Sequence, residues 1–227
     1  MIKLDKVTKK FGTGVFGLSE ITLAVDKGEF VFLVGPTGSG KTTILRLLIR
    51  DILPTEGSII VGEYDIVKLP NKKIPHFRKK IGIVFQDLKL LLDRTIVENI
   101  VLPLELAGFK PAEAKKKAEE IINQVGLLDH RNKFPIQLSG GEIQRTAIAR
   151  ALVLEPEIIL ADEPTGNLDP KTGKEIVDIL LEINKKGTTI IMATHNVEIV
   201  NSLTKRVVTL EKGKLIRDER KGKYEVS

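Results

Sequence analysis

Residues 35–42 read Gly-Pro-Thr-Gly-Ser-Gly-Lys-Thr, and they constrain the fold more than any other part of the chain. Residues 29–34 before them predict a buried strand, and residues 43–50 after them predict a helix. Glycines let backbone amides approach a phosphate, and the N-terminus of the following helix favours an anion. The pattern and its context together predict a P-loop in an α/β fold. A glycine turn that merely links strand and helix is the disfavoured alternative.

Each residue of this loop is a candidate for binding a nucleotide. We expect Lys41 to reach the β- and γ-phosphates and the Thr42 hydroxyl to bind Mg²⁺. The candidate ATP-binding residues of the loop are Gly35, Pro36, Thr37, Gly38, Ser39, Gly40, Lys41, Thr42 and Thr43.

Composition limits the class of protein. A chain of 227 residues with 42% hydrophobic and 29% charged residues is typical of a soluble globular protein. No apolar run approaches the roughly 18 residues that cross a bilayer, and the N-terminus has no secretory pattern. Without cysteine, disulfides and thiolate metal sites are excluded, which favours a cytoplasmic location. The net charge of +6 is modest; we interpret the lysines as a scattered, solvated surface and expect no nucleic-acid partner.

Short runs rich in branched residues predict the sheets. Five of them suit strands buried on both faces and alternate with helical patterns: residues 31–34, 81–85, 158–161, 189–193 and 207–210. Three others are separated by glycine-containing turns and predict a small antiparallel sheet: residues 2–7, 21–25 and 58–61.

The middle of the chain, about 88–154, lacks clear strands. Residues 111–125 predict a helix with Pro111 in its first turn and Gly126 at its end. We therefore expect a single domain, 1–227, with a core of about 1–87 and 155–227 and an inserted α-helical subdomain of about 88–154.

Two adjacent acids follow the predicted strand at 158–161. A strand end delivers its side chains to the edge where α/β proteins bind ligands. Asp162 would hold Mg²⁺, and Glu163 would orient and deprotonate an attacking water. The alternative is a pair of exposed acids in a turn, which the upstream P-loop disfavours.

Residues 138–142, Leu-Ser-Gly-Gly-Glu, predict the start of a helix. Ser139 and Glu142 have the spacing of a capping box, and this holds whatever the function. Two glycines in the first turn cost helix propensity, whereas bare amides at a helix N-terminus suit an anion.

On these residues, with Gln144 and Arg145 after them, the chain resembles the ATP-binding-cassette (ABC) ATPases over its whole length. Leu138, Ser139, Gly140, Gly141 and Glu142 resemble the signature motif of that family. The resemblance further implies that Phe11 stacks on adenine and that Gln86 contacts Mg²⁺ and the attacking water. It also implies that His195 contacts the γ-phosphate. The loop at the dimer interface would be Asn167, Leu168 and Asp169. His76 and His130 match nothing in the family and are interpreted as surface residues.

The resemblance implies a fold and a mechanism. The fold is a P-loop NTPase of the RecA-like type, with a mixed sheet core, a small antiparallel β subdomain and an inserted α-helical subdomain. Two copies would form a homodimer on binding ATP, each nucleotide lying between the P-loop of one copy and the signature helix of the other. A P-loop scaffold without turnover is disfavoured, because Glu163 and His195 are both present.

Within the family, the chain is most similar to the bacterial cell-division ATPases. Residues 91–95 with Asn99 and residues 102–104 carry this similarity; Ile143 and Asn196 depart from the usual pattern. The segment after Gln86 faces the membrane partner in transport-type members. The resemblance thus implies an integral membrane partner and a peripheral location on the inner face of the membrane. The alternatives are the ATPase of a lipoprotein-release or macrolide-efflux transporter and, less favoured, a soluble ABC ATPase acting on nucleic acid or ribosomes.

Overall fold

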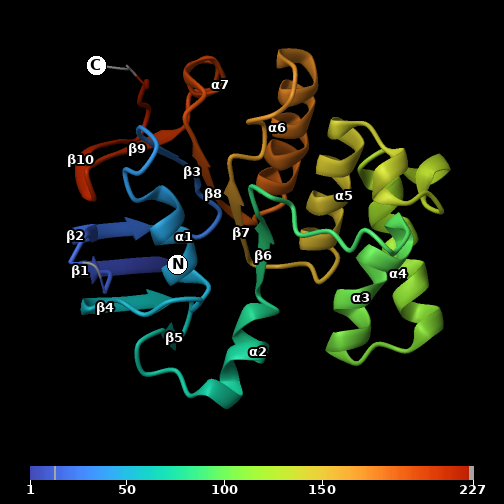
Figure 1. The fold of residues 1–227 in the computed structure, drawn as a ribbon, viewed down its shortest axis with the longest axis horizontal. Helices are drawn as coiled ribbons and strands as arrows, with labels where there is room; N and C mark the ends of the chain where they lie inside the picture. The colour runs from blue at the N-terminus through green and yellow to red at the C-terminus, as the bar shows by residue number, and fades with distance from the viewer. Residues whose placement is uncertain (13, 225–227) are drawn as a thin grey trace.

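Two sheets and a group of helices make up the computed structural model, which describes residues 1–12 and 14–224 (Figure 1). The larger sheet has six strands in the order β10-β9-β3-β8-β7-β6. Its strands are β3 (Phe30–Val34), β6 (Ile81–Val84), β7 (Ile158–Asp162), β8 (Thr189–Thr194), β9 (Arg206–Glu211) and β10 (Lys214–Glu219). All neighbours pair in parallel except β9 and β10, so the sheet is mixed, as predicted.

Both faces of this sheet are covered by apolar side chains. β3, β7 and β8 are buried along their whole length, which explains why their sequences are nearly continuous apolar runs. One face packs on α1 (Lys41–Leu48) and the smaller sheet, and the other packs on α5 (Gly140–Leu152) and α6 (Pro170–Lys185). The five buried strands predicted from sequence are confirmed, with ends that differ by one residue at most.

The smaller sheet is antiparallel, in the order β2-β1-β4-β5. Its strands are β1 (Ile2–Lys10), β2 (Phe16–Val25), β4 (Glu56–Val61) and β5 (Tyr64–Asp65). β1 and β2 run well beyond the predicted residues 2–7 and 21–25. Their pairing shifts register beyond Leu4, and Lys6 and Glu20 have positive φ values of 47° and 51°. Such bulges break the alternation of apolar and polar residues on which the sequence prediction depended.

The middle of the chain is helical. Between residues 88 and 154, all of which are described, there is no strand. The helices of this part are α3 (Ile96–Ala107), α4 (Pro111–Gln124), the 3₁₀ turns η2 (Leu128–His130) and η3 (Pro135–Gln137), and α5. α3, α4 and α5 share an apolar cluster of their own, and in Figure 1 this group lies to one side of the large sheet.

The remaining helices connect the strands. They are η1 (Asn71–Lys73), α2 (Ile74–Arg78) and α7 (Val197–Ser202). The helix predicted over 43–50 is α1; it begins two residues earlier and ends at Leu48, because Arg50 adopts a left-handed φ of 59°. The helix predicted over 111–125 ends at Gln124, and Gly126 turns the chain with a φ of 72°. No helix in the described ranges is both long and apolar enough to span a membrane.

A testable consequence concerns Gly82, which lets α5 approach β6. A Cβ at Gly82 would lie 2.4 Å from the backbone oxygen of Ala151 in α5. Gly82→Ala should therefore destabilise the protein by about 1–3 kcal/mol, the usual range for overpacking. Gly12→Ala is the matched control, because nothing lies within 4 Å of a Cβ there. Urea unfolding of both variants checks this, and equal midpoints would show that α5 is not held against Gly82.

Candidate nucleotide site

The site lies where three parallel strands end together. β3 and β8 are in register at Val34 and Thr194, and β7 pairs with β8 at Asp162 and Ala193. The loop after β3 is residues 35–40, Glu163 follows β7, and His195 follows β8. Strand register thus brings three segments that are far apart in the sequence to one edge of the sheet.

The P-loop is wrapped tightly enough to require glycine at two positions. Gly35 has a φ of 142°, and a Cβ there would lie 2.1 Å from the carbonyl oxygen of Leu210. Gly40 has a φ of 108°, and a Cβ there would lie 2.8 Å from the carbonyl oxygen of Gly17. Ser39 is buried, and its Oγ has no hydrogen-bond partner among the described residues. An unpaired buried hydroxyl in a loop of this shape is available to a ligand.

Lys41 is folded back over the loop. Its Nζ donates to the carbonyl oxygen of Gly35 at 2.7 Å and to that of Pro36 at 3.1 Å. Burial lowers the pKa of Lys41, and the negative charges of Glu163 and Asp162 oppose this shift. The lysine is therefore held at the mouth of the loop by weak neutral acceptors, which a phosphate can replace.

Thr42 and Asp162 are in direct contact. The Thr42 hydroxyl donates to Oδ2 of Asp162 at 2.8 Å. Burial raises the pKa of Asp162, and the charge of Glu163 adds to the rise, whereas the Thr42 hydrogen bond and Lys41 oppose it. A buried carboxylate with few compensating charges attracts a cation.

Glu163 and His195 form a pair. Nδ1 of His195 lies 2.8 Å from Oε1 of Glu163, and the His195 backbone N–H donates to Oε2 at 3.3 Å. Glu163 has a positive φ of 48°, and its backbone N–H donates to the carbonyl oxygen of Ala193. A non-glycine residue held in this conformation is strained, and such strain gathers at functional sites.

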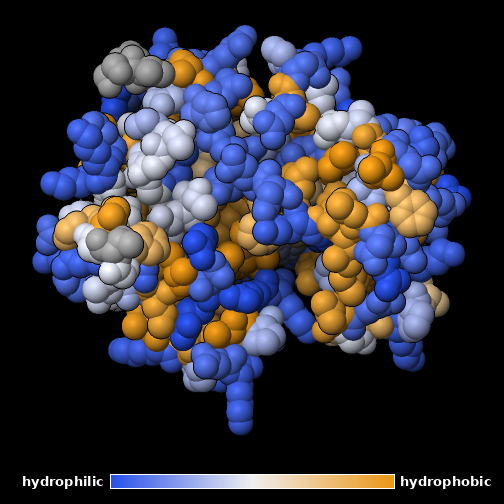
Figure 2. Space-filling view, in the orientation of Figure 1, coloured by the Kyte–Doolittle hydropathy of each residue, from blue (hydrophilic) through white to orange (hydrophobic). Residues whose placement is uncertain are grey.

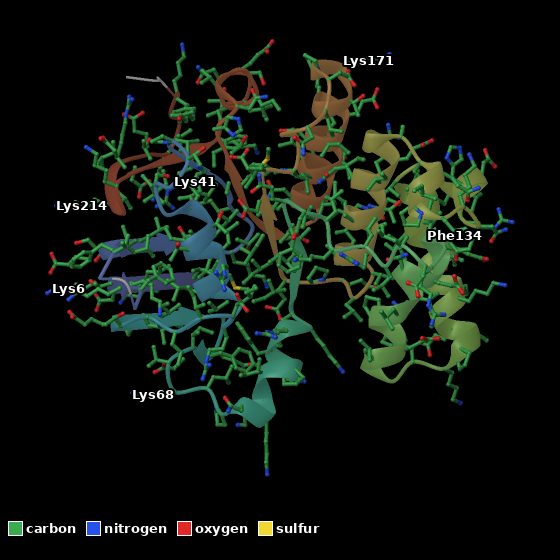
Figure 3. All side chains as sticks on the ribbon, in the orientation of Figure 1. Lys6, Lys41, Lys68, Phe134, Lys171 and Lys214 are labelled. Atoms are coloured by element: carbon green, nitrogen blue, oxygen red, sulfur yellow. The ribbon has the colours of Figure 1, made fainter. Side chains whose placement is uncertain are left out.

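Some of the predicted residues line one of two separate cavities. Thr42, Gln86 and Asp162, the three candidate magnesium ligands, line a cavity of about 950 Å³. Ser139 to Glu142 line a second cavity of about 420 Å³ together with Leu168 and Asp169. Asn167 lines both cavities. In Figure 3, Lys41 and Phe134, which precedes the signature helix, lie well apart. The structure therefore does not bring the signature segment to the P-loop of the same chain.

Phe11 lies beside the P-loop. A Cβ on Gly17 would be 2.5 Å from Cε2 of Phe11, so the ring packs closely over that glycine. Gly17 in turn contacts Gly40 of the loop. The residue is 37% exposed, and Nζ of Lys9 lies over the ring, 5.5 Å from its centroid.

The signature helix begins with the predicted capping box. Ser139 Oγ accepts from the Glu142 backbone N–H at 3.4 Å, and Glu142 Oε2 accepts from the Ser139 backbone N–H at 2.7 Å. The two glycines differ in what they contact. A Cβ on Gly141 would meet Cγ2 of Thr172 at 2.5 Å, whereas one on Gly140 would make an ordinary contact at 3.4 Å. Close packing on α6 therefore accounts for Gly141, and only Gly140 is left free to face an anion.

Two further side chains hold local structure in place: His130 lies beside the signature helix, and Asn99 holds the segment before α3. The His130 side chain is 30% exposed, but its Nδ1 lies 2.7 Å from Oε1 of Glu142, a contact that the sequence interpretation did not expect; His76 is exposed, as predicted. Asn99 is fully buried, and its side chain accepts from Leu91 N–H and donates to the carbonyl oxygens of Leu91 and Arg94. An apolar helical pattern interrupted by one asparagine is the signal that points to Asn99. No periodicity connects His130 to Glu142.

Comparison with known proteins identifies the family. The model of the ABC transporter family matches residues 18–166. The cell division ATP-binding protein FtsE of Bacillus subtilis (strain 168) is 46% identical over 224 residues, covering 99% of this chain and 98% of that protein. FtsE of Mycobacterium tuberculosis (strain ATCC 25618 / H37Rv) is 47% identical over 225 residues, again 99% of this chain and 98% of the relative. A dimeric post-hydrolysis structure of the ATP-binding cassette MJ0796, bound to ADP and Pi, matches with a TM-score of 0.90 at 36% identity, covering 99% of this chain and 100% of that one.

The chain therefore belongs to the ABC transporter family, and it is an ATPase of that family. The predicted fold class and the resemblance to ABC ATPases are confirmed. Within the family, the chain is FtsE-like over nearly its whole length, as the segment after Gln86 indicated.

A testable consequence concerns the ionisation of Glu142. Hydrogen bonds from the Ser139 backbone, then from its hydroxyl, and the nearby His130 lower the pKa of Glu142 below its usual value of about 4.3. Its stabilising effect is therefore complete above about pH 4.3 and is lost as the pH falls through the lower, folded-state value. Glu142→Gln keeps the cap but not the charge. Wild type should lose more stability than Glu142→Gln between about pH 5 and pH 3, by urea unfolding.

The control is Glu119→Gln, which removes a carboxylate within α4 that takes no part in a helix cap. It should follow the wild-type pH dependence. If Glu142→Gln also follows it, the ionised carboxylate does not support the signature helix.

Proposed function

We propose that this chain is the ATP-hydrolysing subunit of a membrane complex with an FtsX-like partner. ATP binding and hydrolysis would change the conformation of that partner and so control peptidoglycan hydrolysis during cell division. The similarity to FtsE proteins over nearly the whole chain is the observation that carries this role. The chain would be cytoplasmic and peripheral, held at the inner face of the membrane through its partner.

The site residues take roles that their positions support. Phe11 stacks on adenine, residues 35–43 bind the phosphates, and the carboxylate of Glu163 takes a proton from the attacking water. The products are ADP and phosphate. The contact between Glu163 and His195 supports a shared function, because both side chains leave neighbouring strand ends at the same edge.

The oxygen donors of the larger cavity fit Mg²⁺. The Thr42 hydroxyl, the Asp162 carboxylate and the Gln86 amide are hard ligands that line one space, and the carboxylate is buried. Bound to these three side chains, Mg²⁺ would supply positive charge that stabilises the negative charge of the phosphates during hydrolysis. The Thr42–Asp162 hydrogen bond keeps both ligands together beforehand.

Catalysis would need two copies of the chain. Ser139 and Gly140 line a cavity separate from the P-loop, so a nucleotide bound at Lys41 is reached by the signature helix of a second copy. The dimeric structures of the similar cassette MJ0796 support a homodimer here. We further propose that the unit of about 88–154 moves against the core of about 1–87 and 155–227 on turnover. Residues 167–169 would lie at the dimer interface.

Glu163→Gln should trap an ATP-bound dimer, because every phosphate contact remains while the proton acceptor is lost. With saturating ATP and Mg²⁺, size-exclusion chromatography should show the dimer and phosphate release should fall by about 10²-fold or more. Adding Ser139→Arg to the same variant should return it to a monomer that still binds nucleotide. Adding Lys41→Ala should instead weaken nucleotide binding itself. A Glu163→Gln protein that stays monomeric contradicts the shared site.

The membrane partner is tested by isolating the tagged chain from gently solubilised native membranes. We expect an FtsX-like integral membrane protein to co-purify. Recovery of a lipoprotein-release or macrolide-efflux permease would be consistent with the ATPase activity but would contradict the role in cell division. Recovery with ribosomes or DNA from a washed cytosolic fraction would overturn the membrane role altogether.

A further inference from the structure

One segment of the chain is basic and contains no acid of its own. Residues 66–80, here called the cationic segment, hold no aspartate or glutamate and six basic residues: Lys68, Lys72, Lys73, Arg78, Lys79 and Lys80. The whole chain has 36 Lys and Arg against 30 Asp and Glu; residues 205–223 are also basic, but there the basic residues alternate with acids. Most lysines of the chain are scattered, as predicted, but this segment gathers six cations without an acid.

The cationic segment forms one end of the molecule. It runs from the end of β5 through η1 and α2 to β6, and in Figure 1 it occupies the lower edge. Figure 3 labels Lys68 at this edge, and Figure 2 shows hydrophilic side chains projecting there. Lys68, Lys72, Lys73 and His76 line the same shallow hollow of about 670 Å³.

The acids facing this segment are already paired. Glu63 lies 3.0 Å from Nζ of Lys80, and Glu157 lies 3.5 Å from the same nitrogen. Asp65 lies 3.6 Å from Nζ of Lys68 and accepts from the backbone N–H of Val67. The three carboxylates thus pair with two of the six cations, and the segment with these acids keeps a net charge of +3.

The other four cations keep their charge uncompensated. Arg78 donates to the carbonyl oxygens of Ile49 and Arg50, and Lys79 to that of Ala107, which are neutral groups. Lys72 and Lys73 are exposed and form no ion pair with any described residue. Four unpaired cations on 15 residues make a positive surface patch.

A lysine run elsewhere in the chain has no such excess. Residues 115–117 are three lysines in α4, but the same helix carries Glu113, Glu119 and Glu120. Lys117 also lies 2.7 Å from Oε1 of Glu155. The two runs differ in local net charge, and this gives a matched control.

We infer that the cationic segment is a contact surface for anionic phospholipid headgroups. Clusters of four or more Lys and Arg are attracted to such surfaces, each strengthening binding several-fold. Val67, 39% exposed beside Lys68, adds an apolar contact. Single-stranded nucleic acid fits less well, because the one aromatic of the segment, Phe77, is buried and unable to stack on a base.

The orientation toward a membrane rests on the proposed function. Arg78 belongs to the segment and also lines the cavity that contains Gln86. If the membrane partner docks beside Gln86, the cationic segment lies next to it and faces the headgroups. Lipid contact would then help to hold the ATPase against its partner.

The test is flotation of the purified chain with vesicles. It should bind vesicles of phosphatidylglycerol and phosphatidylcholine, bind phosphatidylcholine alone far less, and lose binding as salt rises. Lys72→Gln with Lys73→Gln should weaken binding to the anionic vesicles by about 30-fold. Lys115→Gln with Lys116→Gln removes the same charge and should change it by less than about twofold.

Three results would overturn the inference: no binding to anionic vesicles, equal loss in both double variants, or tighter binding of a labelled single-stranded DNA at the same salt. Its failure is separable from that of the proposed function. If the chain does not bind vesicles but an FtsX-like partner still co-purifies, only the lipid contact is contradicted. If the chain binds vesicles but no such partner is recovered, only the division role is contradicted. Basal ATP hydrolysis should be unchanged in both double variants.

Discussion

The parallel register of β3, β7 and β8 is the constraint on which the site depends. Hydrogen bonds that align Val34 with Thr194, and Asp162 with Ala193, fix where each strand ends. A slip of one residue would turn the acid at the end of β7 to the other face of the sheet. Burial of these strands on both faces opposes such a slip, because each strand packs against helices on either side.

The edge of the sheet holds one buried cation, Lys41, and one buried carboxylate, Asp162, that a ligand can pair. Lys41 donates only to neutral carbonyls, and burial lowers its pKa. Asp162 accepts from a hydroxyl, and burial raises its pKa. A buried cation and a buried carboxylate, each without a direct ionic partner among the described residues, are costly in isolation. Phosphate oxygens near Lys41 and a metal cation near Asp162 would offset the cost of burying each charge. The site is therefore suited to an anionic nucleotide with its metal.

Sequence predicts the parts of this structure that depend on local pattern. The P-loop and the capping box of Ser139 were predictable because their residues are neighbours in the chain. The contact of Glu163 with His195 spans 32 residues and follows from strand register, which a single sequence does not encode locally. The pairing of His130 with Glu142 depends on two 3₁₀ turns without periodicity. The left-handed backbone conformation of Glu163 could not be predicted from the sequence either, because glutamate rarely adopts it.

The two cavities are connected within one chain by a short segment of the backbone. Asn167 lines both of them, and two residues later Asp169 caps α6 by accepting from the backbone N–H of Lys171 and Thr172. Thr172 is packed against Gly141 too closely for any larger residue there. The loop that follows Glu163 thus leads into the cap of α6, and the first turn of α6 packs against the signature helix. In the proposed dimer, the chemistry at one nucleotide would in this way reach the surface that holds the other.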